Sequence, residues 1–173
     1  MPLLISLVAL LTVLVLLNLT LAIGLVRRLR DHDQRLATLE QGAPEPMLPL
    51  GERIDAFTAV TVDGEELTRE TLAEGTMVGF FDPQCETCHS HLPLFAAEAA
   101  RRGPGLALGV VREDDESHEM VAVLAPAARV VVERRRGPVA RAFHVEATPA
   151  FCRLGAGQTV VAHGYGHEVA TPA

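Results

Sequence analysis

The chain opens with a long, unbroken run of apolar side chains. From residue 2 to residue 26 no side chain carries a charge, and leucine, valine and isoleucine dominate. At about 1.5 Å of rise per residue, a helix of this length crosses a hydrocarbon layer about 30 Å thick. Only Met1 and Pro2 precede the run, and no Ala-x-Ala cleavage signal follows it. The pattern therefore favours an uncleaved transmembrane anchor over residues 1–26, with residues 3–26 in contact with lipid, rather than a signal peptide.

The segment after this anchor changes its pattern twice. Leucines 25, 29, 36 and 39 lie close to heptad spacing, which predicts an amphipathic helical extension of the anchor. Pro44, Pro46 and Pro49 then interrupt every regular pattern, as in an extended spacer. We assign residues 27–49 to a helical extension and Pro-rich linker. Residues 50–173 remain as one domain, long enough to bury a core of its own.

Within residues 50–173, short apolar runs alternate with amphipathic stretches, which predicts an α/β fold with a mixed sheet. The run 76–81 is wholly apolar, as in a strand buried on both faces of a central sheet. Asp63-Gly64 is a strong hairpin-turn signal between two short strands. The predicted strands are 56–62, 66–67, 76–81, 106–111, 129–133, 150–154 and 159–163. The predicted helices are 68–73, 85–102, 115–124 and a short turn at 141–143.

Composition narrows the classes of function. All 15 basic residues are arginine, 22 residues are acidic, and the formal net charge is −7. This balance argues against a nucleic-acid partner, because phosphate neutralisation requires clustered cations. Three cysteines are too few for a disulfide scaffold. Any cysteine chemistry is therefore expected from a local pair.

That pair is Cys85-Glu86-Thr87-Cys88, which lies between an apolar strand and the start of a predicted helix. A sulfur in the first helical turn meets unpaired backbone N–H groups and the positive end of the helix dipole, and both favour a thiolate. The second sulfur lies one turn further on, within reach of a disulfide. Cys85 is therefore predicted to attack a partner disulfide and Cys88 to resolve the mixed disulfide. Glu86 opposes this chemistry slightly, because a nearby carboxylate disfavours a thiolate.

Two other types of site use the same residues. Cys85 and Cys88, together with a histidine such as His144 or His163, would suit a non-catalytic module that delivers copper. Cys85-x-x-Cys88-His89 also matches the attachment pattern of c-type haem. The first alternative predicts tight metal binding without disulfide exchange, and the second predicts covalently bound haem. The buried strand and Pro83 before the motif, and the strand-rich sequence after it, argue against the haem site.

Two segments together resemble a known family. The first is Phe80-Phe81-Asp82-Pro83-Gln84-Cys85-Glu86-Thr87-Cys88, and the second, about 60 residues later, is Ala147-Thr148-Pro149-Ala150-Phe151. They resemble the thioredoxin fold and, more narrowly, the membrane-anchored TlpA/ResA-like redoxins and the MauD-type methylamine-utilisation accessory protein. The resemblance implies a thioredoxin-like α/β domain after one transmembrane helix, acting as a thiol–disulfide oxidoreductase without a resident cofactor. It also implies a protein substrate carrying a thiol or disulfide, and a protein electron donor or acceptor.

The resemblance also assigns roles to individual residues. Pro149 would be a cis-proline lying against the cysteine pair, and the backbone of Thr148 would pair with an incoming strand of substrate. Two positions depart from the family pattern. Gly79 stands six residues before Cys85, where thioredoxins hold a buried acid, and Gln84 replaces the tryptophan before the motif. These departures favour a narrower range of substrates than that of general thioredoxins.

The remaining features receive simpler interpretations. Cys152 is expected to be a small core residue, with a third redox role as the alternative. The arginine run 134–136 is expected to form an exposed loop, with docking to acidic lipid or to a protein partner as the alternative. The resemblance places the domain outside the cytoplasm. Arg27, Arg28 and Arg30, just after the anchor, favour the cytoplasm by the positive-inside rule.

Overall fold

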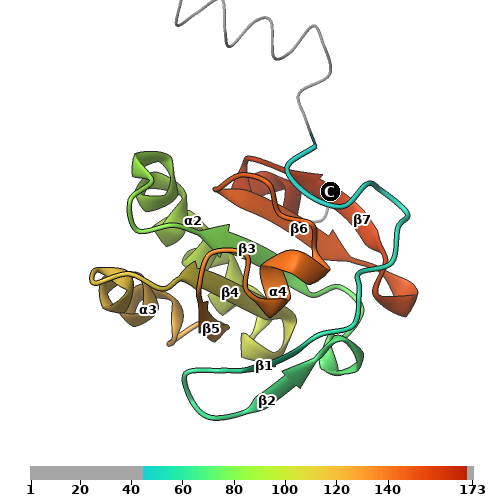
Figure 1. Cartoon of the computed structure of the whole chain (residues 1–173), viewed down its shortest axis with the longest axis horizontal. Coiled ribbons are helices and arrows are strands. Elements are labelled where there is room, and N and C mark those ends of the chain that lie inside the picture. Colours follow the sequence, from blue (N-terminus) through green and yellow to red (C-terminus); the bar gives the residue numbers. More distant parts are fainter. Residues whose placement is uncertain (1–44, 171–173) are drawn as a thin grey trace, which may run out of the picture. The chain divides into compact units, whose positions relative to one another are not determined.

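The computed structural model describes residues 45–170, which are built around a five-stranded mixed sheet (Figure 1). The strand order is β5-β4-β3-β6-β7, in which β3, β4 and β5 are parallel and β6 and β7 run antiparallel to their neighbours. The strands are β3 (Met77–Phe81), β4 (Ala107–Arg112), β5 (Arg129–Glu133), β6 (Ala150–Leu154) and β7 (Val160–Gly164). The predicted α/β class with a mixed sheet is confirmed.

Strand β3 is the central strand because its sequence suits burial on both faces. All five of its residues are buried. It pairs with β4 on one side, with Met77 opposite Ala107, and with β6 on the other, with Met77 opposite Arg153. Successive side chains point to opposite faces, so Phe80 and Phe81 join different core clusters. The apolar run therefore holds both layers of the domain to one sheet.

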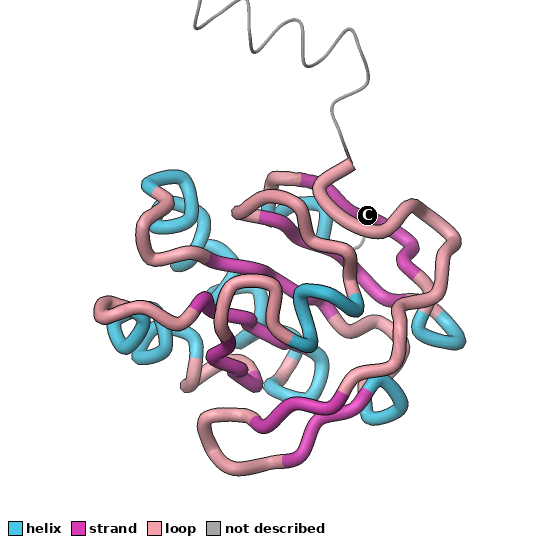
Figure 2. The backbone as a smooth tube through the Cα atoms, in the orientation of Figure 1, coloured by secondary structure: helices cyan, strands magenta, loops and turns pink. Residues whose placement is uncertain are grey.

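The helices and the small β ribbon are divided between these two core clusters. Helices α2 (Glu86–Arg102) and α3 (Ser117–Leu124) contribute Phe95 and Leu124 to the cluster that contains Phe81. Helix α4 (Pro138–Ala142) and the ribbon of β1 (Thr58–Val60) and β2 (Glu66–Thr68) contribute to the cluster that contains Phe80. Figure 2 shows that the ribbon is separate from the main sheet. The sheet is thus covered on both faces.

The predicted hairpin is confirmed, with a shorter first strand than expected. The backbone N–H of Thr61 donates to the carbonyl of Glu65 at 2.9 Å and closes the turn. Gly64 has φ +83°, a conformation that glycine adopts without the steric penalty of a Cβ atom. Asp63-Gly64 therefore acts in the structure as its sequence predicted.

Helix α4 begins at Pro138, three residues before the short helical turn that we expected, and a buried carboxylate explains its start. Glu133, the last residue of β5, accepts hydrogen bonds from the backbone N–H groups of Val139 at 2.9 Å and Ala140 at 2.8 Å. Burial raises the pKa of Glu133, and the two backbone hydrogen bonds oppose that rise. The side chain replaces the hydrogen-bond partners that the first turn of a helix lacks.

The end of the expected linker packs onto the domain. Pro46, Met47 and Leu48 are buried, and the latter two belong to the core cluster around Phe80. The backbone N–H of Leu48 donates to the carbonyl of Phe143 at 2.9 Å. Residues 45–49 are therefore integral to the described unit.

The predicted anchor, residues 1–26, and the helical extension that follows it lie outside the described residues. Between residues 45 and 170, none of the helices combines the length and the apolar character needed to cross a bilayer. Helix α2 is the longest of them, with 17 residues.

Candidate active site

The cysteine pair lies at the junction of β3 and α2. Cys85 is the N-cap of α2, and its sulfur accepts a hydrogen bond from the backbone N–H of Cys88 at 3.2 Å. The backbone N–H of Cys85 in turn donates to the carbonyl of Asp82 at 3.0 Å, which fixes the turn after the strand. The sulfur of Cys85 therefore faces the unpaired N–H end of the helix, where negative charge is stabilised.

The two cysteines differ in their access to solvent. Cys85 is partly exposed, whereas Cys88 is fully buried, and both are free thiols in the structure. An attacking sulfur has to be reached by a partner protein, while a resolving sulfur needs only to reach the first cysteine. The geometry therefore suits Cys85 for attack and Cys88 for resolution.

The second predicted segment lies against this pair. The Thr148–Pro149 peptide bond is cis, as the resemblance implied. The thiol of Cys85 donates to the carbonyl oxygen of Thr148, with 3.6 Å between sulfur and oxygen. The backbone N–H of Thr148 makes no hydrogen bond to any residue between 45 and 170. Cys85 and Thr148 are 63 positions apart in the chain, and the structure brings the two candidate segments together. The unpaired backbone donor of Thr148 lies at the edge of this site.

The turn before Cys85 is held by a network that the sequence pattern did not single out. Asp82 accepts hydrogen bonds from the backbone N–H of Gln84 at 2.9 Å and from Nη2 of Arg112 at 2.6 Å. Gln84 also donates to Asp114 at 3.3 Å. Asp82 directly follows β3 and Arg112 ends the parallel strand β4, so both lie at the same edge of the sheet. The sequence signal for this pair was an acidic and a basic residue at the ends of two neighbouring parallel strands.

The packing around Gly79 leaves no room for a buried acid at this position. A Cβ atom on Gly79 would lie 2.8 Å from the ring of Phe81 and 2.8 Å from the ring of Phe95. These two rings pack edge to face, with 5.4 Å between centroids. The space that an acidic side chain would need is filled by aromatic carbon. Cys88 therefore has no carboxylate base from this position.

The histidines of the alternative sites lie in other environments. His89 Nε2 is 2.7 Å from the carbonyl oxygen of Pro83, so this nitrogen carries the donated hydrogen. His144 is exposed and pairs with Asp55 at 2.9 Å. His163 lies in β7 opposite Cys152. Among residues 45–170, no group of three or more metal-binding side chains comes together.

Cys152 is fully buried in β6, opposite Val78 of the central strand. Burial raises the pKa of its thiol. This environment is that of an unreactive core residue.

The stability of the reduced protein is expected to fall as the pH rises above about 9. Burial, followed by the hydrogen bond with Cys85, raises the pKa of Cys88 from 9.0 to about 12. Between these values the unfolded chain has lost a proton that the folded chain still holds, so higher pH favours unfolding. Denaturant unfolding at several pH values measures this slope. The oxidised protein is the matched control, because its Cys88 has no proton to lose. Equal slopes for the two forms above pH 9 would contradict the assignment.

No protein-family model matches the chain, and no curated protein matches it. Solved structures do. A thio-disulfide isomerase from Thermus thermophilus is 21% identical with a TM-score of 0.56, and the match covers 69% of this chain and 87% of that chain. The thioredoxin domain of a thiol-disulfide oxidoreductase from Bacteroides vulgatus is 15% identical with a TM-score of 0.57, covering 71% and 94%.

A third similar structure is a secreted disulfide oxidoreductase of Mycobacterium tuberculosis, described as homologous to DsbE of E. coli. It is 21% identical with a TM-score of 0.51, and the match covers 63% of this chain and 82% of that chain. At these identities the likeness concerns the fold. Residues 45–170 thus have a thioredoxin-like fold, and the three solved structures described above that share it are thiol–disulfide oxidoreductases or isomerases.

Proposed function

We propose that this protein is a thiol–disulfide oxidoreductase that exchanges disulfides with partner proteins through Cys85 and Cys88. One observation carries the proposal. The sulfur of Cys85, at the N-cap of α2, is partly exposed. It accepts a hydrogen bond from the backbone N–H of the buried Cys88 and contacts the carbonyl of Thr148. The shared fold with known thiol–disulfide oxidoreductases supports it.

The exchange proceeds in two steps that conserve atoms and electrons. The thiolate of Cys85 attacks one sulfur of a partner disulfide, a mixed disulfide forms, and the other partner sulfur leaves and takes up a proton. Cys88 then loses its proton and attacks the sulfur of Cys85. The Cys85–Cys88 disulfide closes and the second partner thiol is released. The partner gains two electrons and the pair loses two, and the reverse sequence oxidises a partner dithiol.

The backbone of Thr148 has a role in binding the substrate. Its unpaired N–H donor, beside the reactive sulfur, suits main-chain pairing with an extended segment of the partner. Such pairing uses the peptide backbone alone, so it holds many sequences in the same position relative to Cys85.

We further propose that residues 3–26 anchor this domain to a membrane, in the manner of TlpA/ResA-like and MauD-type redoxins, and that the domain lies outside the cytoplasm. The uncharged apolar run supports the anchor, and the resemblance supports the location outside the cytoplasm. Arg27, Arg28 and Arg30 favour the opposite orientation. Labelling of Cys85 in spheroplasts with a membrane-impermeant thiol reagent tests it. Labelling only after lysis would place the domain inside.

A redox titration of the full chain in detergent tests the central proposal. After denaturation and thiol labelling, the number of labels is expected to change by two in a single reversible transition, because Cys85 and Cys88 oxidise together. The Cys152→Ser variant is the matched control and should keep the same two-electron transition. The midpoint indicates whether the pair donates or accepts disulfides. If both thiols stay labelled at every potential, or are blocked by metal or haem, the proposal fails.

A further inference from the structure

A cavity of about 330 Å³ opens beside the cysteine pair, at the edge of the sheet where β3, β4 and β5 end. Its walls include Thr148, whose carbonyl contacts the thiol of Cys85, and Asp82, which fixes the turn before Cys85. The cavity therefore borders the reactive sulfur through two residues of the active site. A partner segment that pairs with the backbone of Thr148 would lie next to this cavity.

The cavity has mixed walls, in which four arginines outnumber three acidic residues, Asp82, Glu133 and Glu146. Phe80 and Val110 contribute apolar surface, and four arginines line the cavity: Arg112, Arg134, Arg135 and Arg136. Three arginines in succession come from the run 134–136, between β5 and α4.

Three of the four arginines already have acidic neighbours. Arg112 contacts Asp82 at 2.6 Å, and the other two pairs are longer and more exposed: Arg134 with Glu113 at 3.3 Å and Arg136 with Glu146 at 3.9 Å.

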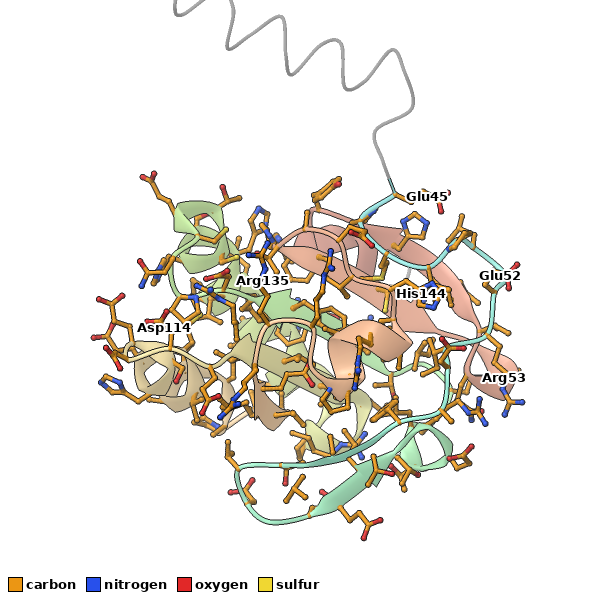
Figure 3. The ribbon with its side chains drawn as sticks, in the orientation of Figure 1. Glu45, Glu52, Arg53, Asp114, Arg135 and His144 are labelled. Atoms are coloured by element: carbon orange, nitrogen blue, oxygen red, sulfur yellow. The ribbon has the colours of Figure 1, made fainter. Side chains whose placement is uncertain are left out.

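Arg135 differs from these three. Within residues 45–170 it makes no hydrogen bond or ion pair. In the view of Figure 3, Arg135 lies between Asp114 and His144. The cavity lining therefore presents one unpaired guanidinium, that of Arg135, on a chain with a net charge of −7.

We propose that this cavity, hereafter the arginine pocket, binds an acidic side chain of the protein substrate within a few residues of the cysteine under attack. The inference rests on the proposed function and names a substrate class for it. An extended strand advances about 3.3 Å per residue, so a carboxylate two to four residues from the target cysteine reaches a pocket that borders Thr148. The guanidinium group of Arg135 has the fork geometry that binds a carboxylate with two parallel hydrogen bonds.

The charge of the whole chain makes this pocket selective. An acidic protein repels an acidic partner over most of its surface, so a local positive site fixes both position and orientation of approach. The departures at Gly79 and Gln84 favour a narrow range of substrates. Binding of an acidic side chain in the arginine pocket would limit that range to substrates with an acidic residue near the target cysteine.

The test measures disulfide exchange by the full chain in detergent with three model peptides of equal length. Each peptide carries a disulfide, and the residue three positions from the target cysteine is Glu, Gln or Lys. The wild-type rate is expected to be about fivefold higher for the Glu peptide than for the Gln peptide at low salt, and lowest for the Lys peptide. Because the Debye length shortens to about 3 Å at 1 M salt, the ratio should approach one there.

Two variants separate the pocket from the general surface. Arg135→Glu and the milder Arg135→Gln should each reduce the Glu-to-Gln ratio to about one or below. Arg53→Glu is the matched control, because Arg53 is an exposed arginine outside the pocket, bonded only weakly to Gln158 at 3.4 Å. It should keep the wild-type ratio. Thermal unfolding of all three variants verifies that each one is folded.

The outcomes are distinguishable. If wild type exchanges no peptide at all, the proposed function fails. If it exchanges all three at equal rates, the function stands and the pocket inference is overturned. If the peptide ratio is insensitive to Arg135 and the variant loses activity only in proteoliposomes of anionic lipid, the pocket binds lipid headgroups, and the inference is also overturned.

Discussion

The Cys85→Ser variant is expected to lose disulfide exchange with a model peptide by at least about 100-fold. Serine matches cysteine in shape, but its hydroxyl does not ionise at neutral pH and forms no disulfide. Cys85 is partly exposed and accepts the backbone N–H of Cys88 at 3.2 Å, so it is the sulfur that a partner can reach. Initial rates of peptide reduction by the pre-reduced full chain measure the loss.

The Cys88→Ser variant is expected to behave differently, because it keeps the attacking sulfur and lacks the resolving one. It should accumulate a covalent complex with the partner, visible by non-reducing electrophoresis and released by a reductant. The double variant Cys85→Ser/Cys88→Ser should form no such complex, and Cys152→Ser should behave as wild type. Accumulation with Cys85→Ser in place of Cys88→Ser would reverse the two roles.

Replacing Gly79 is expected to have the largest effect on stability. Gly79→Ala places a Cβ atom 2.8 Å from the rings of Phe81 and Phe95, and overpacking of this kind costs about 1–3 kcal/mol. Phe81 is held on a second side by Phe151 at 5.6 Å between centroids, so its ring has little room to move. Gly79→Asp adds the desolvation of a buried carboxyl, and we expect a total loss above about 3 kcal/mol.

Denaturant unfolding of the reduced proteins measures both losses. Gly105→Ala is the matched control, because a Cβ atom on Gly105 meets nothing within 4 Å and this glycine has no positive φ. It should unfold at the wild-type midpoint. A Gly79→Asp variant as stable as wild type would show that a buried acid fits at this position, and that its absence has another cause.

Most of the local structure could be predicted from the order of residues. Strand β3 and helix α2 appear within one or two residues of their predicted bounds, because a wholly apolar run and a helical run ended by Gly103-Pro104 are local signals. The hairpin at Asp63-Gly64 and the final antiparallel pair β6–β7 are confirmed for the same reason. The start of α4 was three residues off, because the residue that initiates it, Glu133, comes from the preceding strand.

The candidate site also has features that the sequence predicted and features that it did not. The Cys85–Cys88 spacing is local, and the Thr148-Pro149 segment was placed beside it by resemblance to a family. The Asp82–Arg112 pair was not predicted, since its members are 30 residues apart and meet only because β3 and β4 are parallel neighbours. The burial of Met47 and Leu48 was missed because three nearby prolines resemble a spacer, and only the core around Phe80 provides a place for them.

By itself, the sequence determined the elements, the redox pair at a helix start and the acidic charge of the chain, since periodicity, capping and ionisation act over a few residues. The tertiary structure decided which sulfur is exposed, which backbone donor stays unpaired beside it and which arginines line the neighbouring cavity. Those properties depend on distances between segments far apart in the chain. They are set by strand pairing and by the filling of the space around Gly79 and Thr148.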